Sequence, residues 1–340
     1  MNDLTDEPLV SVIIDNYNYS RFLPYAIDSV FSQTYQNFEL IIVDDGSTDH
    51  SNQIINSYCQ NQKYHNRIIP IFQENSGQGG ACNAGFDHAR GEIICFLDAD
   101  DYYHPKKLEK VVQSFFSHPN WIQVAHCWIS VNSEGMPIGR STSNVLSQGN
   151  VQSLLLKWGK YASGITSALA YRRQALELVM PVPARSIVDS YLNASVPFYG
   201  EVGCINQPLM YYRMHGKNMQ AYNSNMHYLV NERREIAKVI NQSAEKVGVL
   251  QRFDLKNDVD FRAYRIVEVG QATWAEKLQI IQLSIQESMA LRRSLRDSLI
   301  RLVYRSVCVL FPREATTLLG LGFRRYIKQK LQRKAHHYQQ

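Results

Sequence analysis

The chain has 340 residues, of which 45% are hydrophobic, and a formal net charge of +5. This length and composition are sufficient for one large folded domain with an extension. The charge is too small to require a nucleic-acid partner, and the N-terminal half carries no basic run interleaved with aromatic residues. The six cysteines form no CxxC pair, which argues against a zinc site and for reduced, cytosolic thiols.

The first eight residues are acidic and polar, which is unlike a secretory signal. No apolar run approaches the roughly 20 residues that a membrane-spanning helix needs. We therefore expect a cytoplasmic protein, either soluble or bound peripherally to the cytoplasmic face of the cell membrane.

Four short apolar runs alternate with helical patterns in the first hundred residues. The runs, which predict buried strands, are residues 9–14, 38–43, 68–72 and 93–97. Strands that alternate with helices predict an α/β fold whose parallel sheet is joined by right-handed crossovers. Three of these strands end in acidic or Gly-rich turns. Because the carboxyl ends of parallel strands share one edge of the sheet, these turns can meet around one ligand.

The turn after the fourth strand, residues 98–101, reads Asp-Ala-Asp-Asp. Three carboxylates so close together repel one another unless positive charge lies between them. A hard divalent cation shared with a phosphate would supply that charge. A polar loop after a core strand is the alternative, and these residues alone leave both open. The Gly-rich residues 77–80 have neither GxGxxG nor GxxxxGK[ST] spacing, which disfavours a dinucleotide or NTPase fold.

Several sequence blocks, in this order, resemble those of the family 2 glycosyltransferases. The blocks are residues 10–14 with Tyr17 and Asn18, residues 42–49 (Ile-Val-Asp-Asp-Gly-Ser-Thr-Asp), residues 74–85, and residues 97–101 (Leu-Asp-Ala-Asp-Asp). The resemblance covers about residues 8–217 and implies a GT-A fold, the Rossmann-like fold of nucleotide-diphospho-sugar transferases. It also implies inverting transfer from a nucleotide-sugar, with UDP preferred, to a hydroxyl of a glycan or lipid-linked acceptor.

The same resemblance implies a set of site residues. Those expected to contact the nucleotide-sugar are Asp15, Asn16, Tyr17, Asp44, Asp45, Asn75, Gly77, Asn83, Asp98 and Ala99. Asp44 would accept a hydrogen bond from the base, as from uracil N3–H, and Asp45 would either orient its turn or touch the ligand. Asp100 and His215 would bind a divalent metal, Mn²⁺ or Mg²⁺, and Asp98 would face either the ribose or that metal. Asp101 is expected to cap the helix that follows.

Asp189 is the predicted general base. Where the family often has Glu-Asp, this chain has Val188 and Asp189. A carboxylate at this place would take the proton from the attacking acceptor hydroxyl. An acid at a helix N-terminus is the alternative reading of Asp189. Cys82 stands where the family often has arginine. These two departures, Cys82 and Val188, leave open the alternative that the protein is a catalytically degenerate scaffold. A sugar nucleotidyltransferase is less favoured, because residues 15–18 lack the Gly-rich basic loop of that class.

The C-terminal part becomes helical and charged from about residue 221. We therefore expect a catalytic domain over residues 1–217 and a helical extension over 218–340. Residues 299–340 mix apolar and aromatic residues with arginine and lysine, a pattern that can lie on an anionic membrane surface. The alternative is a helical bundle that packs on the catalytic domain or on a second copy of the chain, giving a homo-oligomer.

Overall fold

The computed structural model describes residues 4–138, 146–216, 218, 225–321 and 326. The chain divides into two compact units. The first, the sheet unit, comprises residues 1–153 and 162–213, and the second, the helical unit, comprises residues 154–161 and 214–340.

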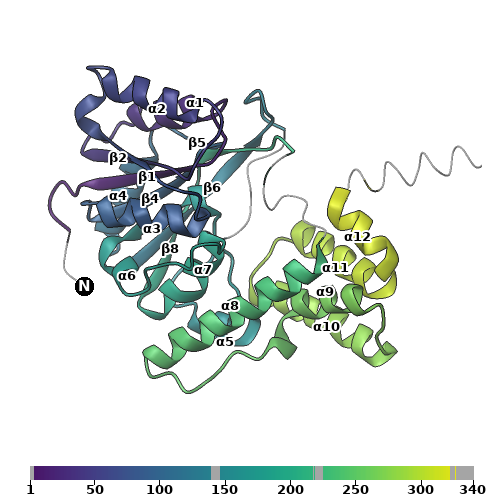
Figure 1. Ribbon diagram of the computed structural model, residues 1–340. Coiled ribbons are helices and arrows are strands. Elements are labelled where there is room, and N and C mark those ends of the chain that lie inside the picture. The colour runs from purple at the N-terminus through teal and green to yellow at the C-terminus, as the bar shows by residue number, and fades with distance from the viewer. Residues whose placement is uncertain (1–3, 139–145, 217, 219–224, 322–325, 327–340) are drawn as a thin grey trace, which may run out of the picture. The chain divides into compact units, whose positions relative to one another are not determined.

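The sheet unit is built on one eight-stranded sheet (Figure 1). Its strands are β1 (Val10–Asn16), β2 (Phe38–Asp44), β3 (Ile68–Phe72), β4 (Ile93–Asp98), β5 (Tyr102–Tyr103), β6 (Trp121–Val131), β7 (Leu169–Arg172) and β8 (Glu201–Arg213). They lie in the order β3-β2-β1-β4-β7-β6-β8-β5. The four strands predicted from the sequence are parallel neighbours, which confirms that part of the prediction.

The other half of the sheet departs from a purely parallel arrangement. β7 pairs antiparallel with both β4 and β6, and β5 pairs antiparallel with β8. β5 comes directly after the turn that follows β4, so its pairing with β8 places the end of β8 beside that turn. The sheet is therefore mixed. Its second half brings residues that are distant in the chain to the acidic turn after β4.

Helices cover both faces of the sheet, and an apolar core lies under each layer. The helices of the sheet unit are α1 (Leu23–Phe31), α2 (Ser51–Gln60), α3 (Gln78–His88), α4 (Lys107–Ser117), α6 (Arg173–Glu177) and α7 (Val188–Ser195). Apolar residues of α1, α2 and α4 share one core, and those of α3, α6 and α7 share the other. Ile13 and Ile14 of β1 enter opposite cores, which explains why the buried strands read as continuous apolar runs.

The helical unit contains α8 (Met226–Lys246), α9 (Val259–Val269), α10 (Trp274–Ala290), α11 (Leu295–Leu310) and α12 (Pro312–Leu321). α5 (Gln152–Trp158) also contributes to it, because the helical unit includes the chain from residue 154 to 161. Polar side chains at Asn225, Asp258, Thr273 and Ser294 cap the N-termini of α8 to α11. None of the described helices is both long and apolar enough to cross a membrane. Of the predicted membrane-contacting segment, residues 322–325 and 327–340 lie outside the described residues.

A buried network of charged side chains ties residues 154–161 into the helical unit. Its members are Lys160, Arg233, Asp258, Asp260, Glu287 and Arg305. The Asp258 carboxylate is fully buried, and it accepts a 2.6 Å hydrogen bond from Arg233 Nε. Lys160 Nζ lies 3.5 Å from Asp258 Oδ1 and also pairs with Asp260. Three cations and three anions balance one another, so removing a single member leaves buried charge uncompensated.

We expect Asp258→Ala to destabilise the helical unit by about 3–5 kcal/mol, because it removes the carboxylate that pairs with Arg233 and one of the partners of Lys160. It also removes the cap of α9, whose Asp260 and Phe261 amides donate to Asp258 Oδ1. Urea unfolding of the full chain, followed by helical circular dichroism, measures the change.

Asp254→Ala is the matched control, because Asp254 is exposed and caps only a 3-10 turn, residues 255–257. Its removal should cost about 1 kcal/mol. Equal losses for the two variants would show that the network contributes nothing beyond a helix cap.

Candidate active site

The carboxyl ends of β2, β1 and β4 lie side by side and form an acidic edge. The parallel register pairs Asn16 with Asp44 and Asp15 with Asp98. β1 lies between the other two strands, so Asp44 and Asp98 are two strand spacings apart, about 10 Å. A nucleoside diphosphate has a comparable span, with its base and its phosphates at opposite ends.

Asp98, Asp100 and Asp101 form the acidic triad at the end of β4. One carboxylate oxygen from each lies within 4.8 Å of the others. Oδ2 of Asp101 and Oδ1 of the adjacent Asp15 are buried, and neither accepts a hydrogen bond from the residues that the structure describes. Buried carboxylate oxygens without partners are costly. Oxygen ligands this close together suit a hard divalent cation, so the residues present fit a Mn²⁺ or Mg²⁺ site.

Burial and, after it, mutual repulsion raise the pKa values of three carboxyl groups at this edge. Burial, together with the charge of Asp100, raises the pKa of Asp15 to about 7. Burial and the charge of Asp15 raise the pKa of Asp98 well above its usual value. Burial and the charge of Asp100 do the same to the pKa of Asp101. Without added positive charge, this cluster therefore holds protons that ordinary aspartates release.

Asp101 is placed differently from its predicted role as a helix cap. α4 begins after Lys106, and no side chain caps it. Oδ1 of Asp101 instead accepts a 3.0 Å hydrogen bond from the Arg213 amide. The capping prediction was wrong because the short strand β5 separates Asp101 from α4 and turns its carboxylate toward the triad.

Three residues support the triad, and local sequence patterns gave little sign of them: Arg213 and Ser167 are distant in the chain, and Lys107 follows soon after Asp101. Arg213 Nε donates to the carbonyl oxygen of Asp100 at 2.9 Å. Ser167 Oγ accepts from the Asp98 amide at 3.1 Å, and the Ser167 carbonyl accepts from Lys107 Nζ at 2.7 Å. Burial lowers the pKa of this fully buried Lys107 to about 7.

Asp45 orients the loop after β3. Oδ1 accepts from Gln73 Nε2, the Ser76 amide and Ser76 Oγ, and Oδ2 accepts from the Gly77 amide at 2.8 Å. Asn75 Nδ2 donates to the Asp45 carbonyl at 3.0 Å. Of the two predicted roles of Asp45, this geometry supports orientation of the turn.

We expect Asp45→Ala to lower the free energy of unfolding by about 2–3 kcal/mol, because two amides lose a charged acceptor. The looser loop should weaken donor binding more than turnover at saturating donor. Thermal unfolding and donor titration measure the two effects. Asp87→Ala, at an exposed position of α3, is the control and should change neither. A fully stable Asp45→Ala protein that has lost donor binding would assign Asp45 to the ligand instead.

The Gly-rich entry to α3 has a packing explanation. Gly77 has φ +84°, a backbone conformation that favours glycine. A Cβ on Gly79 would lie 2.2 Å from the Pro183 carbonyl oxygen. Gln78 at the start of α3 reaches the triad, donating from Nε2 to Asp98 Oδ1 at 3.0 Å. These glycines thus let α3 approach residues 183–184 closely.

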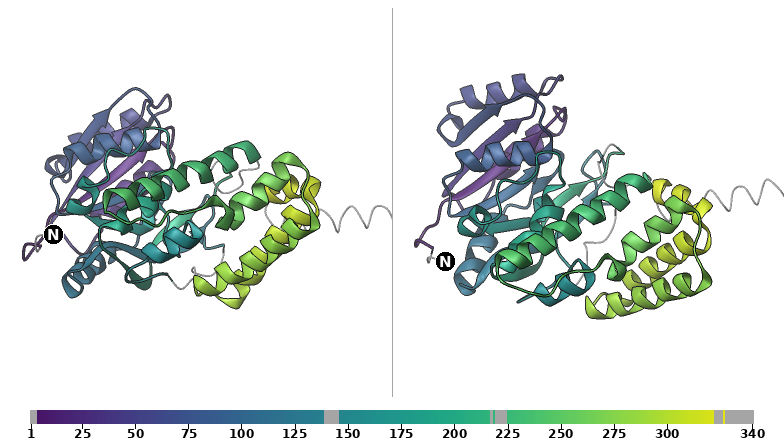
Figure 2. Two further views of the ribbon diagram at one scale, coloured as in Figure 1. Left: turned by 90° about the horizontal axis from the view of Figure 1, so that it is seen from below. Right: turned by 60° about the horizontal axis from the view of Figure 1, so that its bottom comes forward.

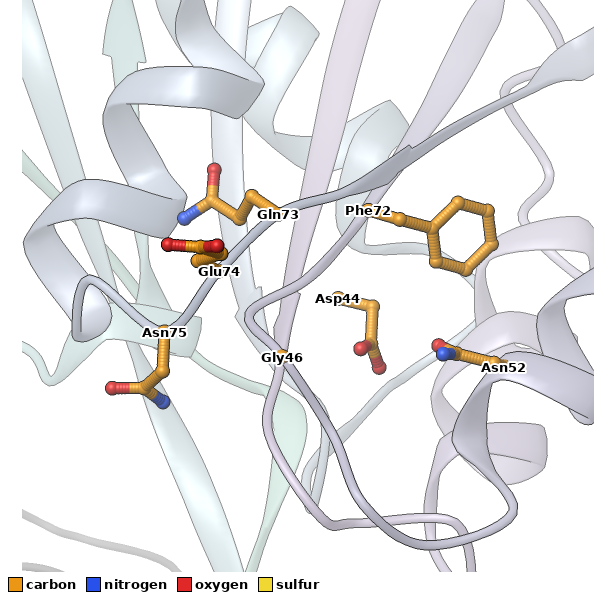
Figure 3. A pocket seen from close by; sticks show the side chains of 7 residues that line it. All are labelled: Asp44, Gly46, Asn52, Phe72, Gln73, Glu74 and Asn75. Atoms are coloured by element: carbon orange, nitrogen blue, oxygen red, sulfur yellow. The ribbon is translucent and has the colours of Figure 1, made fainter.

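A cavity of about 540 Å³ opens beside the end of β2 (Figure 3). Its lining residues are Asp44, Gly46, Asn52, Phe72, Gln73, Glu74 and Asn75. The side chains of Asp44 and Asn52 point toward each other, and the Phe72 ring lies beside them. Asp44 is almost fully buried and accepts from Asn16 Nδ2 at 2.7 Å and from the Ser47 amide at 2.8 Å. The cavity thus offers an acceptor at its base and an aromatic wall.

Asp189 lies in the first turn of α7, and its charge is close enough to raise the pKa of Asp98, although burial is the main cause of that shift. The amide of Val188 approaches Gln78 Oε1 at 3.5 Å. The Val188 side chain is fully buried in the core shared by α3, α6 and α7. An apolar residue therefore suits the place where the family often has glutamate.

The other residues singled out from the sequence are spread over the sheet edge, the core and the helical unit. Tyr17 is 47% exposed at the sheet edge, whereas Ala99 is buried in the core. The side-chain amide of Asn83 exchanges two hydrogen bonds with the Val182 backbone. His215 belongs to the helical unit, so its metal role stays a prediction. Burial raises the pKa of the Cys82 thiol well above its usual value, as suits a core residue.

Comparison with known proteins agrees with this arrangement. The sequence model described as glycosyl transferase family 2 matches residues 11–179. An uncharacterized glycosyltransferase of Nostoc sp. strain PCC 7120 is 36% identical over 272 residues, which are 77% of this chain and 84% of that protein. An uncharacterized glycosyltransferase of Haemophilus influenzae is 42% identical over 120 residues, 35% of this chain and 46% of that protein.

Two solved structures share the fold. Residues 1–349 of TarS from S. aureus superpose with a TM-score of 0.52 at 18% identity, covering 91% of this chain and 90% of that chain. The mannosyltransferase PcManGT from Pyrobaculum calidifontis gives a TM-score of 0.50 at 15% identity, covering 90% of this chain and 88% of that chain. Both confirm the predicted GT-A architecture. Since the Nostoc relative aligns over most of both chains and the family model matches the strands that carry the acidic edge, this chain belongs to glycosyl transferase family 2 and is a glycosyltransferase.

Proposed function

We propose that the chain is an inverting, metal-dependent glycosyltransferase that moves a sugar from a UDP-sugar to a hydroxyl of a glycan or lipid-linked acceptor. The observation that carries the proposal is the spacing of the acidic edge. The Asp44 cavity and the acidic triad lie two strands apart on one sheet edge, so one nucleotide can reach both.

At the base end, Asp44 supplies the acceptor. Each of its carboxylate oxygens accepts one hydrogen bond, which leaves one lone pair on each oxygen for a ligand. Uracil offers one imide N–H. Asp44 thus fits the single imide N–H of uracil, which is the base we propose. PcManGT was solved with GDP-mannose and Mn²⁺, so the fold alone does not choose the base.

At the phosphate end, Asp98, Asp100 and Asp101 would hold the divalent cation, Mn²⁺ or Mg²⁺, that we propose as cofactor. When bound, that ion supplies positive charge for the leaving diphosphate. Asp101 is an addition to the predicted ligand set, made because its unpartnered oxygen lies within the triad. Arg213 and Ser167 hold the turn through its backbone, so the carboxylates are positioned before donor binds.

At the acceptor end, Asp189 would act as the general base. It would take the proton as the acceptor oxygen attacks the anomeric carbon, while the bond from that carbon to the diphosphate breaks. Attack from the side opposite the leaving group inverts the anomeric centre. The place of Asp189 in the first turn of α7, within electrostatic reach of Asp98, supports this role.

The test is a panel of nucleotide-sugars with the full chain and Mn²⁺, measuring both nucleotide binding and release of the nucleoside diphosphate. We expect UDP to bind at least tenfold tighter than GDP and at least one UDP-sugar to be turned over. Asp44→Ala should remove the preference for UDP. Binding without turnover of any donor, with acceptor extracts present, would favour the degenerate scaffold that Val188 and Cys82 left open.

A further inference from the structure

The helical unit exposes apolar side chains along one side of α10. Trp274, Leu278, Ile285 and Met289 are 71%, 64%, 46% and 74% exposed. Their spacing of four, seven and four residues places them along one helix face. The opposite side of α10 is already buried, through residues such as Ile280 and Glu287. The exposed face is therefore not part of the helical core.

The exposed apolar residues continue on the next helix. α10 and α11 pack against each other and are joined by a short turn, as the views in Figure 2 show. Leu295 and Leu299, at the start of α11, are 85% and 61% exposed. We call Trp274, Leu278, Ile285, Met289, Leu295 and Leu299 the apolar stripe. Contiguous exposed apolar residues of this kind mark an interaction surface.

The sequence that follows α10 is strongly basic. Residues 292–340 contain twelve lysines and arginines but only two acidic residues, whereas residues 1–213 contain fourteen basic and twenty acidic residues. Two exposed arginines lie where α10 is followed by α11. Arg292 is in the connecting turn, and Arg296 is in the first turn of α11. Positive charge thus accompanies the exposed apolar residues and is concentrated in this part of the sequence.

We propose that the apolar stripe docks on an anionic lipid surface, with α10 and the start of α11 lying in the interfacial region. Apolar side chains with an interfacial tryptophan, flanked by basic residues, have the composition of helices that bind such surfaces. A symmetric contact with a second copy would bring together two faces that each carry the exposed Arg292 and Arg296, which disfavours self-association as the use of this face. The contact begins at Trp274, upstream of the segment predicted from sequence.

The test uses the full chain in flotation with vesicles of neutral lipid, alone or with one third anionic phospholipid. We expect binding only to the anionic vesicles and its loss at high salt. Leu278→Glu/Met289→Glu should weaken vesicle binding at least tenfold. Gln279→Glu/Gln286→Glu adds the same charge at other exposed positions of α10 and should weaken it less than threefold. Because all four positions are exposed, both variants should fold.

Two readouts decide the outcome. The fluorescence of Trp274, identified by its loss in Trp274→Phe, should shift to shorter wavelength when anionic vesicles are added. Hydrolysis of donor in solution should be unchanged by the stripe variant, so failure here leaves the proposed transferase activity untouched. No binding to anionic vesicles, equal weakening by both double variants, or a solution dimer that Leu278→Glu/Met289→Glu dissociates would each overturn the proposal.

Discussion

Asp100→Asn is expected to lower turnover about a thousandfold or more while making the protein slightly more stable. Asp100 lies in the acidic triad; burial raises the pKa of both Asp15 and Asp101, and the charge of Asp100 raises each of them further. On the proposed function Asp100 would help to hold the divalent cation, and weaker binding of that cation would remove several kcal/mol of charge stabilisation for the leaving diphosphate; each 1.36 kcal/mol changes the rate tenfold. In the metal-free protein, the same change relieves repulsion among buried carboxylates.

Lower activity together with higher stability distinguishes loss of a site residue from general unfolding, which would lower both. Turnover is measured across a Mn²⁺ titration, and thermal unfolding is measured without metal. Asp87→Asn carries the same substitution at an exposed position of α3 and should change neither quantity. Turnover within threefold of wild type, with an unchanged Mn²⁺ requirement, would remove Asp100 from the metal site.

Asp189→Asn is expected to reduce transfer by about 10²–10⁴-fold and to leave the affinity for UDP within twofold of wild type. Asparagine keeps the shape of the side chain but cannot accept the proton from the acceptor hydroxyl. The residue lies on α7, whereas the Asp44 cavity is formed by residues at the ends of β2 and β3 and at the start of α2. Donor binding and proton transfer should therefore separate in this variant.

Single-turnover transfer and UDP titration are the measurements for Asp189→Asn. Glu177→Gln, an exposed change on the neighbouring helix α6, should leave both unaffected. Near-wild-type transfer would place the base elsewhere. Loss of UDP binding together with transfer would make Asp189 part of the donor site instead of the base.

Local patterns in the sequence were sufficient for the parallel half of the sheet and for the acidic residues at its edge. Buried parallel strands are apolar on both faces, so their positions and order are visible as runs between helical segments. Asp44 and Asp98 each end such a run, and the parallel topology then places them on one edge. The caps of the C-terminal helices, as at Thr273, are equally local signals.

Only the tertiary structure decided what surrounds those acids. Asp101 lies in the triad, and Arg213 and Ser167 bind the backbone of the turn that carries it. The Asp45 carboxylate accepts hydrogen bonds from the loop after β3. The contacts of Asp45 lie between the parallel neighbours β2 and β3, whereas those of Arg213 and Ser167 depend on antiparallel pairing between strands far apart in the chain. Such pairing has no local periodicity, because its register is set by long-range packing against the sheet. The exposure of the apolar stripe, similarly, depends on which helix faces the core of the helical unit leaves uncovered.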